Sequence, residues 1–336
     1  MWHTGKCNQT NTQVDDHTLD NVDLVLEHEF RYGGAQRLAS IFAKRLKKRL
    51  YYIGDGKHQC LCWDKKVINS VPRGEYLLSM SVNKKKPIVI PGKKQIKFMH
   101  SFENIKLLNK FEQFKKFAWI THRQRVYEQA ADLGYRIYFI PKGFVLYDIT
   151  QKIRKYTKEE KTMPLVSISR IERDNRIDVS VEIANMLNLQ MVVLGTNKDM
   201  TYMDELKLKG HQGIDIIGEV DEKDKIKFLD KSRILIHSTD GKFRDYLDYS
   251  IIDGLVHGCV PLCITPDRNQ FSEIERLGLG HAVSTKSEAS KAIIDIEDNF
   301  DYFQTNIYRF IRKFANDQDN MLKRYVKTIQ KITSDW

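Results

Sequence analysis

Three observations predict an α/β chain of two doubly wound domains in tandem. At 336 residues the chain exceeds the usual size of a single domain. Apolar runs of strand length alternate with segments of helical periodicity, as they do in parallel sheets covered by helices. This series occurs twice, before and after a strongly charged stretch at 148–162. We therefore expect two domains with a ligand-binding cleft between them.

The first series follows a polar N-terminal arm at 1–21 and is assigned to an N-terminal domain at 22–158. It opens with a strand at 22–30, a Gly33-Gly34 turn and a basic amphipathic helix at 35–50. Further strands are expected at 50–53, 87–90, 96–100, 117–121 and 136–140. Further helices are expected at 104–114 and 123–133.

The second series has the same pattern and is assigned to a C-terminal domain at 162–300. Its strands are expected at 165–169, 191–194, 214–217, 234–237 and 260–264. Its helices are expected at 179–187, 222–229 and 251–257. The tail has helical character from 301 to 332, so residues 301–336 form a separate helical segment.

The positive charge of the chain lies in its first half. The net charge is +11, whereas residues 1–160 alone carry 30 Lys and Arg against 16 Asp and Glu, a net of +14. A domain this basic attracts polyanions such as nucleic acid, anionic lipid or polyphosphate. A lysine-rich surface that serves only solubility is the alternative explanation.

Other features favour a cytoplasmic protein without a metal centre. The first twenty residues lack the apolar segment of a signal peptide, and no apolar run reaches the ~20 residues of a transmembrane helix. The five cysteines lack the spacing of a zinc site and are interpreted as reduced thiols. Asp317 and Asp319 have the spacing of a metal-binding pair, but a solvated helix face accounts for them. Walker loops, zincin helices and nucleophile elbows are absent from the sequence.

Residues at several strand ends are suited to ligand binding, because ligands of open α/β sheets lie at the carboxyl ends of strands. The pair Gly33-Gly34 lets the backbone approach a phosphate or sugar, although many tight turns use two glycines. Arg170, Arg173 and Arg176 follow the first strand of the second domain and could neutralise a diphosphate, or form a solvated loop. His100 ends another strand and is a weaker candidate for a polar contact or proton transfer.

The most specific pattern begins at Asp245. Asp245 and Asp248 precede a predicted helix, Asp253 falls one turn inside it, and Gly258-Cys-Val-Pro261 follows. A carboxylate in this place can accept two hydrogen bonds from a ribose while the helix N-terminus faces a phosphate. Capping of the helix by Asp245 or Asp248 is the simpler interpretation and does not exclude the other role.

Taken in this order, these segments resemble the retaining GT-B glycosyltransferases that carry a Glu-x7-Glu motif. Phe30–Leu38 is similar to the strand, Gly-Gly turn and helix that open the family's first domain. Ser169-Arg170-Ile171 stands where the family has Gly-Arg-Leu, and His237-Ser238 resembles its Pro-Ser. Asp245–Asp253 stands where the family has the two glutamates.

The resemblance implies two Rossmann-like domains, a donor cleft between them and a C-terminal helix that crosses back onto the N-terminal domain. It implies a nucleotide-sugar co-substrate of the UDP-sugar type, no other cofactor, and transfer with retention and without a metal. The residues expected at the donor are Gly33, Gly34, Arg170, Arg173, Asn175, Arg176, Tyr249, Ser250 and Asp253. Those expected at the transferred sugar are His100, Asp245 and Asp248.

The chain departs from the family pattern at three places. Both family glutamates are aspartates here, which are one methylene shorter. The family's lysine position falls on Asn175, so Arg173 or Arg176 must supply the missing charge. The usual Pro-Asn-Gly is Pro141-Lys-Gly143.

A narrower resemblance concerns the acceptor. Leu247–Pro261 is similar to the matching segment of the T-even phage DNA α-glucosyltransferase, and in that register the acidic pair is Asp248 and Asp253. Together with the basic N-terminal domain, which holds the acceptor in GT-B enzymes, this predicts transfer of glucose to a hydroxymethylated pyrimidine in DNA. The lysines expected to contact DNA phosphates are Lys84, Lys85, Lys86, Lys93, Lys94, Lys97, Lys115 and Lys116.

Two alternatives stay open. An envelope glycosyltransferase would act on a lipid or surface polymer, and the basic helix at 35–50 would lie on an anionic membrane. An inactive GT-B module would bind DNA or sugar without transfer, since the differences from the family fall in its motifs.

Overall fold

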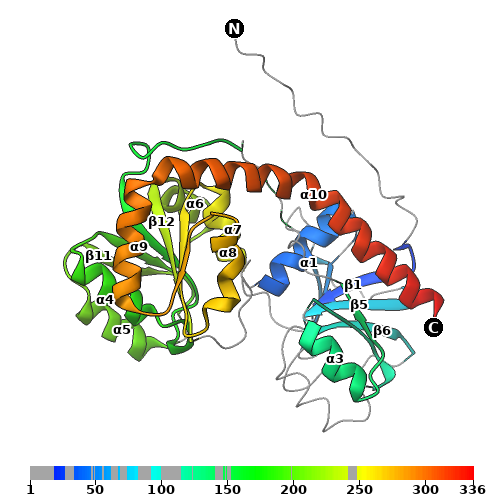
Figure 1. Cartoon of the computed structure of the whole chain (residues 1–336). Coiled ribbons are helices and arrows are strands. Elements are labelled where there is room, and N and C mark those ends of the chain that lie inside the picture. The colour runs from blue at the N-terminus through cyan, green and yellow to red at the C-terminus, as the bar shows by residue number, and fades with distance from the viewer. Residues whose placement is uncertain are drawn as a thin grey trace. The chain divides into compact units, whose positions relative to one another are not determined.

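The computed structural model describes residues 19–26, 34–46, 48, 50–54, 57–61, 67–68, 74–81, 92–99, 115–122, 124–140, 147, 149, 153–197, 199–240 and 248–336. Contacts divide the chain into unit 1, residues 1–148 and 317–336, and unit 2, residues 149–316. Each unit contains one sheet with helices packed on it, as Figure 1 shows.

Unit 2 contains a parallel sheet in the order β11-β10-β9-β12-β13-β14. Its strands are β9 (Met163–Ile168), β10 (Met191–Leu194), β11 (Ile214–Gly218), β12 (Ser232–Ser238), β13 (Val260–Ile264) and β14 (His281–Val283). Its helices are η3 (Arg173–Asn175), α4 (Ile177–Met186), α5 (Met200–Lys209), α6 (Glu222–Lys231), α7 (Tyr249–Val256), η4 (Arg268–Phe271), α8 (Ser272–Arg276) and α9 (Lys286–Asp298). This is the strand order of dinucleotide-binding folds, and its direction reverses between β9 and β12.

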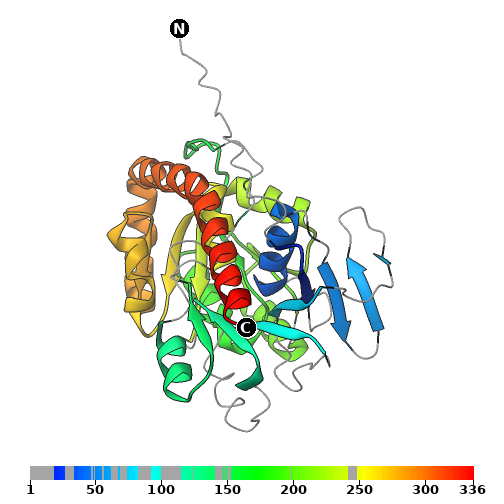
Figure 2. The same ribbon diagram turned by 90° about the vertical axis from the view of Figure 1, so that its right-hand side faces the viewer.

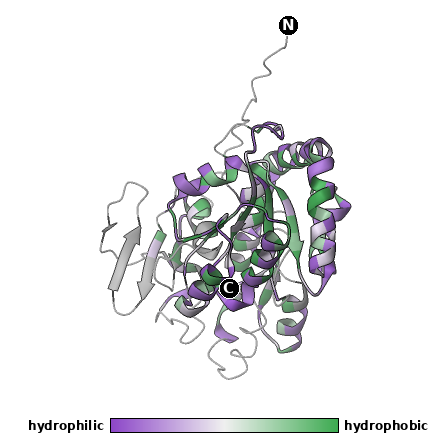
Figure 3. Ribbon diagram, turned by 90° about the vertical axis from the view of Figure 1, so that its left-hand side faces the viewer, coloured by the Kyte–Doolittle hydropathy of each residue, from purple (hydrophilic) through white to green (hydrophobic). Residues whose placement is uncertain are grey.

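The inner strands β10 and β13 of unit 2 are apolar throughout. All residues of β10 and β13 are buried, because a parallel sheet covered on both faces has no solvated side. Figure 3 shows central strands of this unit in the green of hydrophobic residues.

Unit 1 contains a sheet in the order β4-β3-β2-β1-β5-β6-β7-β8, in which the pairs β4-β3 and β3-β2 are antiparallel and the other pairs are parallel. Its strands are β1 (Val22–Leu26), β2 (Leu50–Gly54), β3 (Lys57–Leu61), β4 (Val67–Ile68), β5 (Tyr76–Ser81), β6 (Lys94–Met99), β7 (Ala118–Thr121) and β8 (Ile137–Phe139). Its helices include α1 (Gly34–Arg45) and α3 (Gln124–Asp132).

The last helix, α10 (Phe300–Ser334), ends on the sheet of unit 1. The Tyr76 hydroxyl donates to the carbonyl oxygen of Thr333 (3.1 Å), and the Trp336 ring lies 4.8 Å from the Arg136 guanidinium. Figure 2 shows these last turns, in red, beside the strands of unit 1. The C-terminal helix therefore returns to the first domain, as expected.

The predicted α/β fold class is confirmed, but several elements were missed. The most important is β5, an inner strand of unit 1, whose short apolar part (Leu77, Leu78) lacks a longer strand pattern. The other missed elements include β3, β4, β14, α5, α8 and α9. The helix expected at 35–50 ends at Arg45, because Leu50 pairs with Leu24 in the sheet. The elements expected at 87–90 and 104–114 lie outside the described residues.

Part of the charged stretch at 148–162, which was expected to link the two domains, is buried in unit 2. Tyr156 and Lys161 have exposed fractions of 7% and 0%. Lys161 Nζ donates to the Leu229 carbonyl oxygen (2.9 Å) and to that of His257. Burial lowers the pKa of Lys161 and raises the pKa of the nearby Cys259 thiol to about 11. Charge alone does not identify a linker when an aromatic ring and a lysine stem can pack.

We predict that Gly258→Ala destabilises unit 2 strongly. Gly258 has φ +73°, which costs an alanine about 1–2 kcal/mol, and its Cβ would lie 2.2 Å from Tyr156 Cδ2. Overpacking adds about 1–3 kcal/mol to the loss of unfolding free energy. The control is Gly134→Ala, with φ +77° and no neighbour within 4 Å of the added Cβ. Calorimetric unfolding measures both, and an equal loss in the two variants would contradict the packing.

Candidate functional site

The reversal of strand order in unit 2 brings two of the expected strand ends to one sheet edge. β9 and β12 pair in parallel, so the turn at Ser169-Arg170 and the end of β12 at Ser238 lie beside each other. The backbone N–H of Asp240 donates to the carbonyl oxygen of Asp174 (3.0 Å), which ties the two connections together. Gly195 follows β10 and lets this connection pack closely against the backbone at Ser169, because a Cβ there would lie 1.7 Å from the Ser169 carbonyl oxygen.

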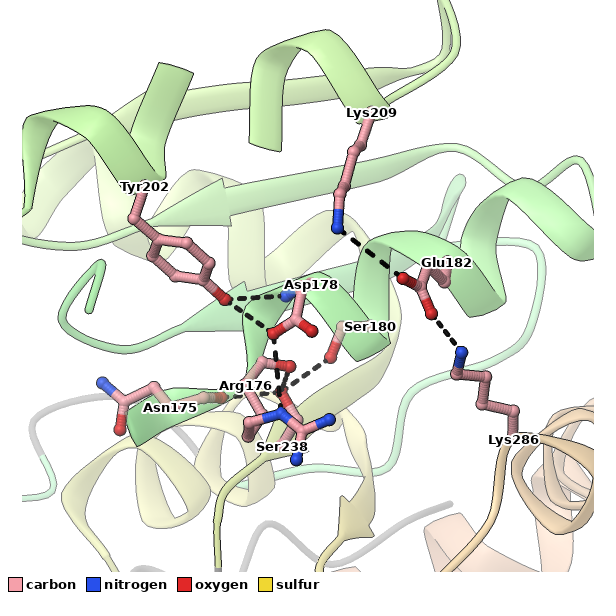
Figure 4. A network of polar contacts seen from close by, with 9 residues as sticks. All are labelled: Asn175, Arg176, Asp178, Ser180, Glu182, Tyr202, Lys209, Ser238 and Lys286. Atoms are coloured by element: carbon pink, nitrogen blue, oxygen red, sulfur yellow. Dashed lines mark hydrogen bonds and ion pairs between the residues drawn. The ribbon is translucent and has the colours of Figure 1, made fainter. Parts of the chain in front are cut away.

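Ser238 fixes the start of α4. Its Oγ lies 2.8 Å from the carbonyl oxygens of Asn175 and Arg176 and accepts from the Ser180 hydroxyl at 3.0 Å. Arg176 has φ 46°, a left-handed backbone that is uncommon for a residue with a side chain. The hydrogen bonds from Ser238 support this corner, and Figure 4 shows them converging on it.

Asn175 supports the same turn from inside. It is 2% exposed, and its Nδ2 donates to the carbonyl oxygen of Arg170 (2.5 Å). Asn175, which was expected at the nucleotide-sugar donor, thus forms a buried hydrogen bond that shapes the loop carrying Arg170.

The three arginines have different surroundings, although all three side chains are about half exposed. Arg170 follows β9 and pairs with Glu172 (2.7 Å). Arg173 lies over the Tyr202 ring at 5.0 Å and binds Glu205 of α5 at 2.7 Å. Arg176 lies 3.7 Å from Asp178. Arg173 is thus held toward α5. Arg170 lies nearest to the carboxyl end of β9 along the chain.

The helix α4 is anchored further along its length (Figure 4). The Tyr202 hydroxyl donates to Asp178 Oδ1 (2.8 Å) and accepts from the Asp178 backbone N–H (2.9 Å). Glu182 forms ion pairs with Lys209 (3.8 Å) and with Lys286. These contacts join α4 to α5 and α9, so the turn before α4 has a fixed base.

The start of α7 is the second part of the site. Tyr249 and Ser250 are its first residues, and Asp248 occupies the N-cap position without a side-chain capping hydrogen bond. Asp248 Oδ2 instead lies 3.9 Å from Nε2 of His237, a 3% exposed residue at the end of β12. The first N–H groups of a helix have no partner within the helix and attract anions.

Asp253 lies within α7 and is ion-paired. Its side chain is 5% exposed, and Oδ2 is 2.9 Å from Lys225 Nζ of α6. Lys225 is 14% exposed and also contacts Glu222 at 2.7 Å. Lys225 could not be singled out from the sequence, because α6 is a charged helix in which no pattern distinguishes this lysine from its neighbours.

Some expected site residues lie outside the described part of the chain: Gly33, Lys84, Lys85, Lys86, His100 and Asp245. Gly34 is the first residue of α1. Within the described residues, no group of three or more His, Cys, Asp and Glu side chains is placed to hold a metal ion.

The expected DNA contact at Lys97 is wrong. Lys97 is 0% exposed, with Nζ 4.6 Å from the centre of the Phe117 ring, because β6 is an inner strand covered on both faces. Lys93 donates to the Gly74 carbonyl oxygen (2.7 Å), and Lys94 pairs with Glu75 (2.9 Å). The remaining described lysines of the set, Lys115 and Lys116, are exposed.

The apolar face of α1 is not available to a membrane. Leu38, Ile41 and Phe42 are at most 6% exposed, since they pack in the core of unit 1. On its basic face, Arg45 pairs with Asp319 of α10 (3.0 Å). The apolar face of this helix is therefore not free to insert into a bilayer. Among the helices that the structure describes, none has the length and apolar character to cross a membrane.

We predict that Ser238→Ala lowers the unfolding free energy by about 1–3 kcal/mol, because buried partners lose a hydrogen bond. Ser290→Ala is the matched control, since the partly exposed Ser290 donates within its own helix, to the Lys286 carbonyl oxygen. This variant should stay within about 0.5 kcal/mol of the parent. Denaturant titration measures both. An unchanged stability of Ser238→Ala would show that the corner does not depend on this hydroxyl.

No protein-family model and no curated relative match the chain. Solved structures do match it. Anabaena HepE in complex with UDP and glucose has 11% identity and a TM-score of 0.59, covering 94% of this chain and 98% of that chain. WaaG, a glycosyltransferase involved in lipopolysaccharide biosynthesis, has 13% identity and a TM-score of 0.60, covering 92% and 99%. An α-glucosyltransferase in complex with UDP and a 13-mer DNA containing an HMU base has 10% identity and a TM-score of 0.62, covering 90% and 98%. The chain therefore has the two-domain GT-B fold of these proteins.

Proposed function

We propose that this chain is a glycosyltransferase and that unit 2 binds its nucleotide-sugar donor. The observation that carries the proposal is the sheet edge where Arg170, the first turn of α7 and the buried Asp253 belong to neighbouring elements. An arginine and a helix N-terminus suit a diphosphate, and a carboxylate suits a ribose. The likeness to UDP-bound proteins of the same fold supports a UDP-sugar.

In the proposed reaction, the acceptor hydroxyl oxygen forms a bond to the anomeric carbon of the sugar. The bond from that carbon to the diphosphate oxygen breaks, and the nucleoside diphosphate leaves with the electron pair. The acceptor attacks on the face from which the diphosphate leaves, and this retains the anomeric configuration. The hydroxyl proton passes to the leaving phosphate on that same face. Arg170 and the α7 N-terminus stabilise the charge that develops on the leaving group.

We propose modified DNA as the acceptor and unit 1 as the part that binds it. The residues of unit 1 carry 30 Lys and Arg against 17 Asp and Glu, and Lys115 and Lys116 are exposed there. Such an excess favours phosphate binding with a strong salt dependence. The α-glucosyltransferase complex with DNA supports the same acceptor. The likeness to WaaG supports a surface-polymer acceptor as the second candidate.

We predict that Arg170→Ala and Asp253→Ala each lower sugar transfer by about 10²–10³-fold, the effect of removing a strong electrostatic contact to the transition state or donor. Asp215→Ala is the control, because Asp215 is an exposed aspartate on the edge strand β11 of the same unit. Its transfer rate should equal that of the parent protein.

The assay offers radiolabelled UDP-sugars with DNA that contains hydroxymethylated pyrimidines, with unmodified DNA and with lipid vesicles or surface polymer. Label on modified DNA alone is the expected result. Label on a lipid or polymer would contradict DNA as the acceptor and support the second candidate. Donor hydrolysis without any labelled acceptor would contradict DNA as substrate, and the absence of all turnover would contradict an enzyme.

A further inference from the structure

Asp253 and Lys225 form an ion pair that is almost removed from solvent. Their side chains are 5% and 14% exposed, and Lys225 Nζ is 2.9 Å from Asp253 Oδ2. The two residues come from different helices, α6 and α7, which follow β11 and β12 and so both begin at the carboxyl ends of strands in the same parallel sheet. A carboxylate buried to this degree needs a partner to stay ionised, because isolated buried charges are strongly disfavoured.

The lysine also restricts how the carboxylate is oriented. Aspartate has one fewer rotatable bond than glutamate, and the contact to Oδ2 fixes the plane of the carboxylate. A carboxylate can accept about four hydrogen bonds, so the ion pair is compatible with further donors such as a ribose diol. Lys225 also pairs with the Glu222 carboxylate, which is 58% exposed. Because solvent screens this second ion pair, it contributes little to holding the lysine in place.

Lys225 is not needed to join α6 and α7, because these helices are also joined near their C-terminal ends. Lys161 Nζ donates to the carbonyl oxygens of Leu229 and His257 there. His257 Nδ1 also lies 2.8 Å from Asp230 Oδ1. The ion pair at Asp253 therefore has an effect on the site that is separable from helix packing.

We propose that Lys225 is a positioning residue: it holds the Asp253 carboxylate in the orientation that accepts the ribose hydroxyls, and so makes the donor site prefer ribonucleotides to deoxyribonucleotides. This inference rests on the proposed donor site in unit 2. It adds a residue that determines specificity without touching the ligand.

Calorimetric titration of the full chain with UDP and with 2′-deoxy-UDP tests the proposal without an acceptor. The parent protein is expected to bind UDP about tenfold or more tightly than 2′-deoxy-UDP, as expected for a hydrogen bond to a charged group. In Lys225→Met and Lys225→Gln this ratio falls to about twofold or less, since the carboxylate is no longer oriented. Lys225→Arg, which keeps the positive charge, is expected to retain most of the parent's preference for UDP over 2′-deoxy-UDP.

Glu222→Gln is the matched control, because it removes the exposed partner of Lys225 and leaves the ion pair to Asp253 intact. Its ratio should equal that of the parent. Two folded lysine variants that bind both nucleotides more weakly by the same factor would overturn the inference and assign Lys225 a purely structural role. A parent protein that binds neither nucleotide would instead overturn the proposed function.

Discussion

The reversal of strand order between β9 and β12 determines where unit 2 presents its polar backbone. On either side of this point the connections run in opposite directions, so the carboxyl ends of the two strands are not covered by a crossover. The turn at Arg170 follows β9, and α7 is the helix that follows β12. The contacts between the turn before α4 and the end of β12 depend on this topology, because it brings segments about 70 residues apart in the chain to one edge.

Buried polar groups keep this edge in shape. Asn175 and Ser238 satisfy backbone carbonyls of the turn before α4, and Asp253 is balanced by Lys225. Each of these groups would be costly to bury without its partner. The exposed arginines differ, since their ion pairs lie in water, contribute little to stability and can exchange partners when an anion binds.

Strands with long apolar runs could be predicted from the sequence, and β10 and β13 have the predicted bounds. Strand β5 could not, because its apolar part is too short, and neither could the burial of Lys97 on an inner strand. Asp248, Asp253 and Arg170 could be proposed as site residues from the sequence, because motifs order them along the chain. The pairing of Lys225 with Asp253 was not, because it depends on how α6 and α7 pack rather than on spacing.

A crystal structure of the full chain with UDP would show directly whether unit 2 binds the donor. The diphosphate is expected at the first turn of α7 and the Arg170 side chain, with the ribose hydroxyls on Asp253. A nucleotide bound elsewhere in unit 2, or in contact with neither Arg170 nor Asp253, would contradict this expectation.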